Sequence, residues 1–272
     1  MLSITEQPTQ TDKLIALRFY LIVIVVIVIA FVLLQAFDLN SSLFFAINET
    51  SKDLIPDVIA AHLTELGNGS VVGMLALGLT LKYPMIAKRF LFITLMAGIL
   101  ISVFKQFFAD PRPAGVLAST DFHIIGDVLK QYSFPSGHTT TAFAMAGFIM
   151  LTFASVPLRI SVLVLAILAG LSRISVGAHW PEDVLAGAAL GLLIAYVGCL
   201  LSLKPFSLMG SYFTAAFLAL AALIGILTAP ADFPEITTIA DARLLCAILA
   251  VVVLIYYAMR LGQLYLSKAY KS

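Results

Sequence analysis

The sequence predicts an all-α integral membrane protein with eight transmembrane helices, in which a six-helix core precedes two additional helices. Apolar residues make up 61% of the 272-residue chain and charged residues only 11%, whereas roughly a quarter of the residues are charged in an average soluble domain. The mean hydropathy is +1.04. The apolar residues also form long uncharged runs of the length that crosses a bilayer as a helix.

The first uncharged run, over residues 19–37, is longer than the apolar part of a signal peptide, and no small-residue cleavage pattern follows it. We therefore interpret it as a retained first helix behind a cytoplasmic segment, 1–18. The other expected helices follow similar runs, at 56–81, 90–109, 138–156, 159–176, 182–203, 211–229 and 240–262. These divide the chain into a core over 19–203 and a region over 204–272 that holds the last two helices and a short cytoplasmic tail.

Basic residues indicate the orientation. With eight helices both chain ends lie on one side of the membrane, and that side carries ten of the 16 lysines and arginines. The positive-inside rule then makes both termini cytoplasmic. The longer connections, at 38–55, 110–137 and 230–239, are expected on the opposite face, which is the periplasmic face of a bacterial inner membrane. Functional residues are expected in such irregular segments.

Two classes of partner or cofactor are disfavoured. The net charge is +1 and no basic block occurs, so nucleic acid is not an expected partner. Cys199 and Cys246 both lie inside apolar runs, and we interpret them as packing residues rather than as a disulfide or metal ligands.

The first polar cluster, KQFFADPRP, lies at the outer end of the third expected helix. Lys105 and Arg112 are about two turns apart, and Pro111 and Pro113 end the helix between them. Two fixed cations near the lipid headgroups favour an anion. Taken alone, such a pair more often extends toward the interface or contacts lipid phosphates loosely.

The second cluster, PSGH, reads as the start of the fourth helix. Ser136 can cap the helix, Gly137 permits close approach, and the first-turn N–H groups form an anion site. His138 could donate a proton from this position. A capped helix start with an interfacial histidine is the plainer alternative.

The third cluster, SRISVGAHWPED, connects the fifth and sixth helices. Asp183 follows His179 by four residues, so its carboxylate can reach the imidazole and leave the other ring nitrogen free as a nucleophile. Arg173 ends the preceding helix, and Pro181 suits a first helical position. A purely structural His–Asp cap is the alternative, and Glu182 has no assigned role.

Together the three clusters supply what phosphoryl transfer through a covalent histidine requires: fixed cations for the phosphoryl oxygens, an oriented nucleophile and an acid for the leaving group. A zinc site would not benefit from three nearby cations, and the acids are not clustered as magnesium would require. No metal or cofactor is therefore expected.

The three motifs resemble the signature of the type 2 phosphatidic acid phosphatase (PAP2) superfamily, which reads Lys-x6-Arg-Pro, Pro-Ser-Gly-His and Ser-Arg-x5-His-x3-Asp. All three parts occur in order, from Lys105 to Pro113, Pro135 to His138 and Ser172 to Asp183. The resemblance covers the six-helix core and leaves 204–272 without a role.

The resemblance implies that His179 attacks phosphorus, Asp183 orients it and His138 protonates the leaving group, without a metal. The residues implied to hold the phosphate are Lys105, Arg112, Ser136, Gly137 and Arg173. The expected activity is hydrolysis of a lipid phosphate at the periplasmic face, on undecaprenyl diphosphate, phosphatidylglycerol phosphate, phosphatidic acid or a lipid A phosphate. A lipid-to-lipid phosphotransferase with the same site is the main alternative, and a lipid transporter is a remote one.

Three further ionisable residues lie near the expected outer face. His62 and Glu65 precede the apolar part of the second helix, and we expect them to make structural polar contacts, although they could line a substrate entrance. His123 lies in the connection 110–137 and is expected to be solvated rather than catalytic.

Overall fold

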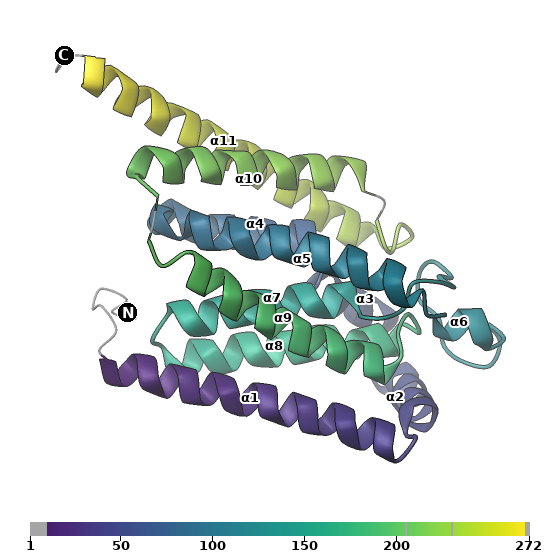
Figure 1. Ribbon diagram of the computed structural model, residues 1–272. Coiled ribbons are helices and arrows are strands. Elements are labelled where there is room, and N and C mark those ends of the chain that lie inside the picture. Colours follow the sequence, from purple (N-terminus) through teal and green to yellow (C-terminus); the bar gives the residue numbers. More distant parts are fainter. Residues whose placement is uncertain (1–9, 205, 230, 270–272) are drawn as a thin grey trace.

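The computed structural model describes residues 10–204, 206–229 and 231–269, and the regular structure in these ranges is helical throughout (Figure 1). Eleven α-helices and one short 3-10 helix follow in chain order: α1 (Gln10–Ala36), α2 (Asn40–Leu54), α3 (Asp57–Glu65), α4 (Gly69–Lys82), η1 (Pro84–Ile86), α5 (Ala87–Phe108), α6 (Pro113–Val116), α7 (Gly137–Thr152), α8 (Val156–Ser175), α9 (Pro181–Leu201), α10 (Leu208–Thr228) and α11 (Thr237–Ala269).

Helix α7 forms the centre of the bundle, with α8 and α9 packed along it and α1, α4 and α5 around them. Close approach of α7 and α9 depends on Gly187 and Gly191. A Cβ atom on Gly191 would lie 2.3 Å from the carbonyl oxygen of Thr140, and one on Gly187 would lie 2.7 Å from that of Ser136. Because these glycines lack a side chain, the starts of α7 and α9 lie against each other.

The two C-terminal helices pack on the rest of the bundle. Helix α10 contacts α4 and α5, and α11 contacts α10 and α4. The buried apolar cluster between them includes Met74 and Leu77 from α4 and Leu218 from α10. The hydroxyl of Tyr257 on α11 donates to Thr80 Oγ1 on α4 at 2.7 Å. The last two helices are therefore firmly joined to the core (Figure 1).

Within the described residues, six helical segments are long and apolar enough to cross a membrane: 14–36, 84–116, 156–175, 181–201, 208–228 and 237–267. In the first of these segments, 14–36, only 17% of the most apolar 18-residue stretch is buried, so its apolar surface suits contact with lipid. Each of these segments corresponds to an expected span, and the chain is a multi-pass membrane protein. Helices α4 and α7 have 14 and 16 residues, so the count of eight spans stays a prediction.

The expectation of one continuous helix over 56–81 is wrong. The segment breaks after Glu65 and resumes at Gly69, where the side chain of Asn68 accepts a hydrogen bond from Ser70 N at 3.0 Å. A Cβ atom on Gly67 would lie 2.7 Å from the carbonyl oxygen of His138. The break therefore lets the chain pass close to the start of α7.

The expectation of a loop over 38–55 is also wrong, because most of this segment is α2. Its buried Asn48 donates to the carbonyl oxygens of Ile174 and Ser175 at 3.1 and 3.0 Å. The same side chain exchanges two hydrogen bonds with the backbone of His123. Through these hydrogen bonds, helix α2 holds the end of α8 in place.

The two ends of the described chain lie at one end of the bundle, and α2, α6 and the loop between α10 and α11 lie at the other (Figure 1). Helix α1 already begins at Gln10 and α11 continues to Ala269, so both extend beyond the expected spans. Residues 1–9 of the expected cytoplasmic segment, and 270–272 of the expected tail, lie outside the described residues.

Candidate active site

The start of α7 is fixed by a cap and by its neighbour α9. Ser136 is fully buried, and its Oγ accepts hydrogen bonds from Thr139 N at 3.4 Å and Thr139 Oγ1 at 2.9 Å. The backbone N–H of Ser136 donates to the carbonyl of Asp183 at 3.0 Å. The predicted serine cap is thus confirmed, and the first turn of α7 offers its N–H groups to an anion next to the start of α9.

A tight turn brings His179 back to the end of α8. The carbonyl oxygen of Arg173 accepts from the backbone N–H groups of Ala178 and His179 at 3.0 and 3.1 Å. The turn passes through Gly177 at φ +74°, where a Cβ atom would lie 2.6 Å from the carbonyl oxygen of His123. A side chain at position 177 would strain this turn, so glycine is needed for Arg173 and His179 to lie side by side.

His179 and Asp183 form the buried centre of the site. His179 Nδ1 lies 3.2 Å from Asp183 Oδ2, and both side chains are 1% exposed. The same oxygen accepts from Ser133 Oγ at 2.5 Å and from Trp180 N at 2.8 Å. Three groups therefore converge on one carboxylate oxygen, which fixes the imidazole through Nδ1 and leaves Nε2 for chemistry.

Arg112 is held beside this pair by backbone carbonyls. Its Nε donates to Gln131 O at 2.9 Å and its Nη1 to Ala178 O at 3.1 Å, and the residue is 6% exposed. The indole of Trp180 donates to Pro111 O at 3.1 Å. These contacts join the segment after α5 to the turn that carries His179.

Lys105 and Arg173 complete the group of cations. Lys105 Nζ donates to Tyr132 O at 3.0 Å, and a Cβ atom on Gly137 would lie 3.8 Å from Lys105 Cε. Arg173 is 3% exposed, and its buried Nε has no hydrogen-bond partner among the described residues. An unpaired buried guanidinium donor is costly, and a phosphate oxygen is a suitable acceptor for it.

The cations also determine the protonation of His179. Burial lowers its pKa well below the ordinary value, and Arg112, Arg173 and Lys105 lower it further because each repels a second proton on the ring. The imidazole is therefore neutral at physiological pH, which is the state a nitrogen nucleophile requires.

Two residues of this site were missed from the sequence. Asp232, in the loop between α10 and α11, places Oδ2 at 2.8 Å from His138 Nε2 and 3.9 Å from Arg173 Nη1. The sequence placed the connection 230–239 on the same face as the motifs, but it also contains Glu235, and nothing distinguished one acid from the other. Ser133 was missed too, since a serine outside the three motifs carries no signal.

All eight expected site residues gather at one end of the bundle: Lys105, Arg112, Ser136, Gly137, His138, Arg173, His179 and Asp183. Glu182, which had no role, accepts from Gln35 Nε2 at 2.5 Å and its N–H donates to Asn40 Oδ1 at 3.1 Å. It therefore ties the start of α9 to α1 and α2.

The expectations for the three further ionisable residues, His62, Glu65 and His123, compare differently with the structure. His62 Nε2 lies 2.9 Å from Thr238 Oγ1, which confirms a structural contact. Glu65 is 6% exposed, and neither carboxylate oxygen has a hydrogen-bond partner among the described residues, so the expected polar contact is wrong for this residue. His123 was expected to be solvated, but its Nε2 lies 2.9 Å from Asp57 Oδ1.

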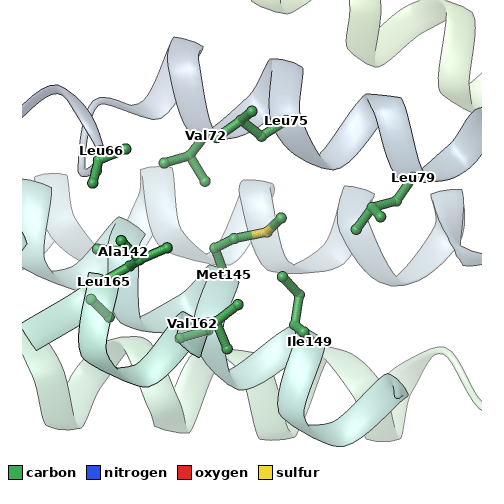
Figure 2. A pocket seen from close by; sticks show the side chains of 11 residues that line it. Leu66, Val72, Leu75, Leu79, Ala142, Met145, Ile149, Val162 and Leu165 are labelled. Carbon is green, nitrogen blue, oxygen red and sulfur yellow. The ribbon is translucent and has the colours of Figure 1, made fainter. Parts of the chain in front are cut away.

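Apolar pockets lie along α7, beyond its polar first turn. Figure 2 shows one of about 220 Å³, where Val72, Leu75 and Leu79 of α4 face α7 and α8. A second, of the same volume, lies between α4, α5 and α7, and Ile101 and Thr141 line it. A Cβ atom on Gly137 would lie 3.4 Å from Ile101 Cγ2, so a residue that lines this second pocket also contacts the start of α7.

Comparison with known proteins gives similarities in sequence and in structure. A lipid A 1-phosphatase of Porphyromonas gingivalis is 36% identical over 116 residues, which are 42% of this chain and 23% of that protein. The putative undecaprenyl-diphosphatase YbjG of Escherichia coli is 32% identical over 169 residues, 60% of this chain and 80% of that protein. The chain covers less than two thirds of the length of the lipid A 1-phosphatases that it matches.

The fold is also found in a solved structure. The crystal structure of Aquifex aeolicus LpxE matches with a TM-score of 0.53 and 30% identity, over 60% of this chain and 95% of that one. The model of the PAP2 superfamily matches residues 86–205, a range that contains all three motifs. With the YbjG match over most of that protein's length, these findings show that the chain belongs to the PAP2 superfamily.

Proposed function

We propose that this protein is a membrane lipid phosphatase that hydrolyses a lipid phosphate monoester or diphosphate through a phosphohistidine on His179. The observation that carries the proposal is the 3.2 Å contact between His179 Nδ1 and Asp183 Oδ2, inside a group of three cations. This contact leaves Nε2 as the ring nitrogen for attack, and the cations bind the oxygens of the phosphoryl group.

In the first step, His179 Nε2 forms a bond to phosphorus and the bond between phosphorus and the leaving oxygen breaks. The leaving oxygen takes a proton from His138, and Asp183 balances the positive charge that develops on His179. In the second step, water attacks phosphorus, the nitrogen–phosphorus bond breaks and His138 recovers a proton from the water. Lys105, Arg112 and Arg173 hold the non-bridging oxygens, so the proposal requires no metal.

Three observations support a lipid as substrate. The polar cluster lies at one end of a membrane-type bundle. Ile101, which lines an apolar pocket, lies next to Gly137. Relatives are named lipid A 1-phosphatase and undecaprenyl-diphosphatase. A phosphate at the start of α7 could thus keep its hydrocarbon chain among apolar side chains. Undecaprenyl diphosphate, phosphatidylglycerol phosphate, phosphatidic acid and lipid A phosphates are the proposed candidates, at the periplasmic face of a bacterial inner membrane.

The test is phosphate release by the full-length protein in lipid nanodiscs, with EDTA present and the four candidate lipids supplied separately. The proposal expects release from at least one lipid, and a loss of roughly 10⁴-fold or more in His179→Ala. His62→Gln is the matched control, because the ring of this histidine hydrogen-bonds to Thr238 and not to a site residue in the part of the chain that the structure describes. Full activity in His179→Ala contradicts the proposal, and label that moves to an acceptor lipid supports a phosphotransferase instead.

A further inference from the structure

The loop between α10 and α11 places a carboxylate inside the candidate active site. Asp232 Oδ2 lies 2.8 Å from His138 Nε2 and 3.9 Å from Arg173 Nη1. Among the described residues, neither His138 Nε2 nor Asp232 Oδ2 has a well-aligned hydrogen bond, and their contact is an ion pair when the imidazole is protonated. Each of these two buried polar atoms depends on the other for compensation.

The position of Asp232 is fixed by its surroundings. The next residue, Phe233, is 2% exposed and lies in an apolar cluster with Ile125 and Val176. A Cβ atom on Gly126 would lie 2.5 Å from the carbonyl oxygen of Asp232, so the connection before α7 passes directly over this residue. Arg243 on α11 donates to the carbonyl oxygens at the end of α10. The buried Phe233 side chain therefore holds the loop in place, and the neighbouring Asp232 side chain points to His138 in the site.

The charges around His138 show why a carboxylate is useful there. Arg173 from α8 and Lys105 from α5 act on His138 as positive charges, and His138 in turn acts on His179. Asp232 is the negative group in contact with the ring. Glu65 from α3 is repelled by Asp232 and attracted by Arg173. Cations that bind a phosphate also repel the proton that a general acid must carry.

Asp232 is ionised under working conditions. Burial alone would raise its pKa, but the contact with His138 and the nearby Arg173 and Arg243 outweigh burial and lower the pKa to about 2. The loop thus presents a full negative charge to His138 at neutral pH.

We propose that Asp232 is a positioning residue that holds His138 through Nε2 and compensates the charge of its protonated ring, so that Nδ1–H is ready to protonate the leaving oxygen. The inference rests on the proposed function, because the proton of His138 matters only if this residue is the general acid. Asp232 would then orient His138, the general acid, as Asp183 orients His179, the nucleophile. The loop between the two C-terminal helices would in this way contribute a residue to the active site.

The first experiment compares Asp232→Asn with the wild type, as full-length proteins in nanodiscs, on two substrates. One is the lipid alkyl phosphate, whose leaving alkoxide needs a proton, and the other is a phosphate monoester of an acidic phenol, whose leaving group does not. We expect kcat on the alkyl phosphate to fall about 10- to 100-fold with KM nearly unchanged, and kcat on the phenyl ester to fall far less. Asp232→Glu should recover part of the loss.

The pH profile and a double-mutant cycle show whether Asp232 acts through His138. The alkaline limb of kcat should move to lower pH in Asp232→Asn, because the ring loses the charge that favours its proton. In a His138→Ala background, Asp232→Asn should have no further effect. Glu235→Gln is the matched control, since this acid is exposed and lies on the same loop. Retained vanadate binding and an unchanged gel-filtration profile verify that each variant is folded.

Six results overturn the inference. Unchanged kcat in Asp232→Asn shows that the carboxylate does not contribute to catalysis. A higher kcat, or tighter binding of vanadate, shows that it competes with the phosphate for Arg173. Equal losses on both substrates, or a full further loss in the His138→Ala background, show that it acts elsewhere. Full activity of His138→Ala itself contradicts the acid step of the proposed function, and the inference falls with it.

Discussion

His179, just before α9, and Asp183, in the first turn of α9, lie with His179 Nδ1 3.2 Å from Asp183 Oδ2, and both side chains are buried. The hydroxyl of Ser133 and the backbone N–H of Trp180 also donate to this oxygen. The carboxylate is therefore held in place before any substrate arrives, and it in turn fixes the tautomer of the imidazole.

Replacing Asp183 by Asn should lower kcat by roughly 10³-fold, because the amide cannot balance the charge that develops on His179 and can hold the wrong tautomer. KM should change little, since Asp183 makes no contact with the expected phosphate. Steady-state phosphate release measures both constants. A loss confined to KM would show instead that Asp183 acts on substrate binding.

The acid limb of the kcat/KM profile should lie below pH 6.5, the ordinary pKa of histidine. The sign follows from the lowered pKa of His179, which keeps the nucleophile neutral to a lower pH. Replacing Arg112 by Gln removes a charge that lowers this pKa, so the limb should move to higher pH. The same substrate is used for both proteins, so its own ionisation cancels. A limb that stays in place would contradict the electrostatic role of Arg112.

Replacing Arg173 by Gln should weaken inhibition by vanadate about 10- to 100-fold, because the buried guanidinium supplies charged donors to the oxyanion. Arg173→Lys should recover little, since an ammonium cannot reproduce the planar fork. Inhibition constants from phosphate-release assays test this. Arg89→Gln is the control, because Arg89 contacts Thr152 at the other end of α7. Equal inhibition of Arg173→Gln and wild type would remove Arg173 from the phosphate site.

Replacing Gly191 by Ala should destabilise the protein by about 1–3 kcal/mol, because the new Cβ would lie 2.3 Å from Thr140 O and 2.8 Å from Ala144 N. Gly78→Ala is the control, since a Cβ at that position meets no atom within 4 Å, and alanine favours a helix. Thermal unfolding in detergent measures both variants. Equal melting temperatures would show that α7 and α9 can separate without cost.

The sequence predicted the site better than it predicted the path of the chain. Lys105, His138 and Asp183 were found because each ionisable group interrupts an apolar run and lies at a motif spacing. The helix break at Leu66–Asn68 was missed because the segment over 56–81 contains no proline after its start. Helix α2 was missed because most of its polar residues are exposed and only Phe44 and Asn48 are buried, which leaves no extended apolar pattern.

Asp232 is a site residue that sequence motifs do not identify. Its partner His138 lies 94 positions earlier in the sequence, and the pairing depends on how α10 and α11 pack against α4 and on the burial of Phe233. Nothing in the neighbouring residues distinguishes Asp232 from the exposed Glu235. Tertiary packing alone determines which of the two carboxylates enters the site.

The most direct test of the account is to trap the covalent intermediate. The wild-type protein is mixed with a substrate labelled at the transferred phosphorus, quenched in alkali within milliseconds and digested, and the labelled peptide is sequenced. A phosphohistidine mechanism predicts an acid-labile, alkali-stable phosphoryl group on His179, absent from His179→Ala and accumulating to a higher level in a variant whose hydrolysis step is slowed. Label on another residue, or turnover with no labelled peptide at any quench time, would contradict it.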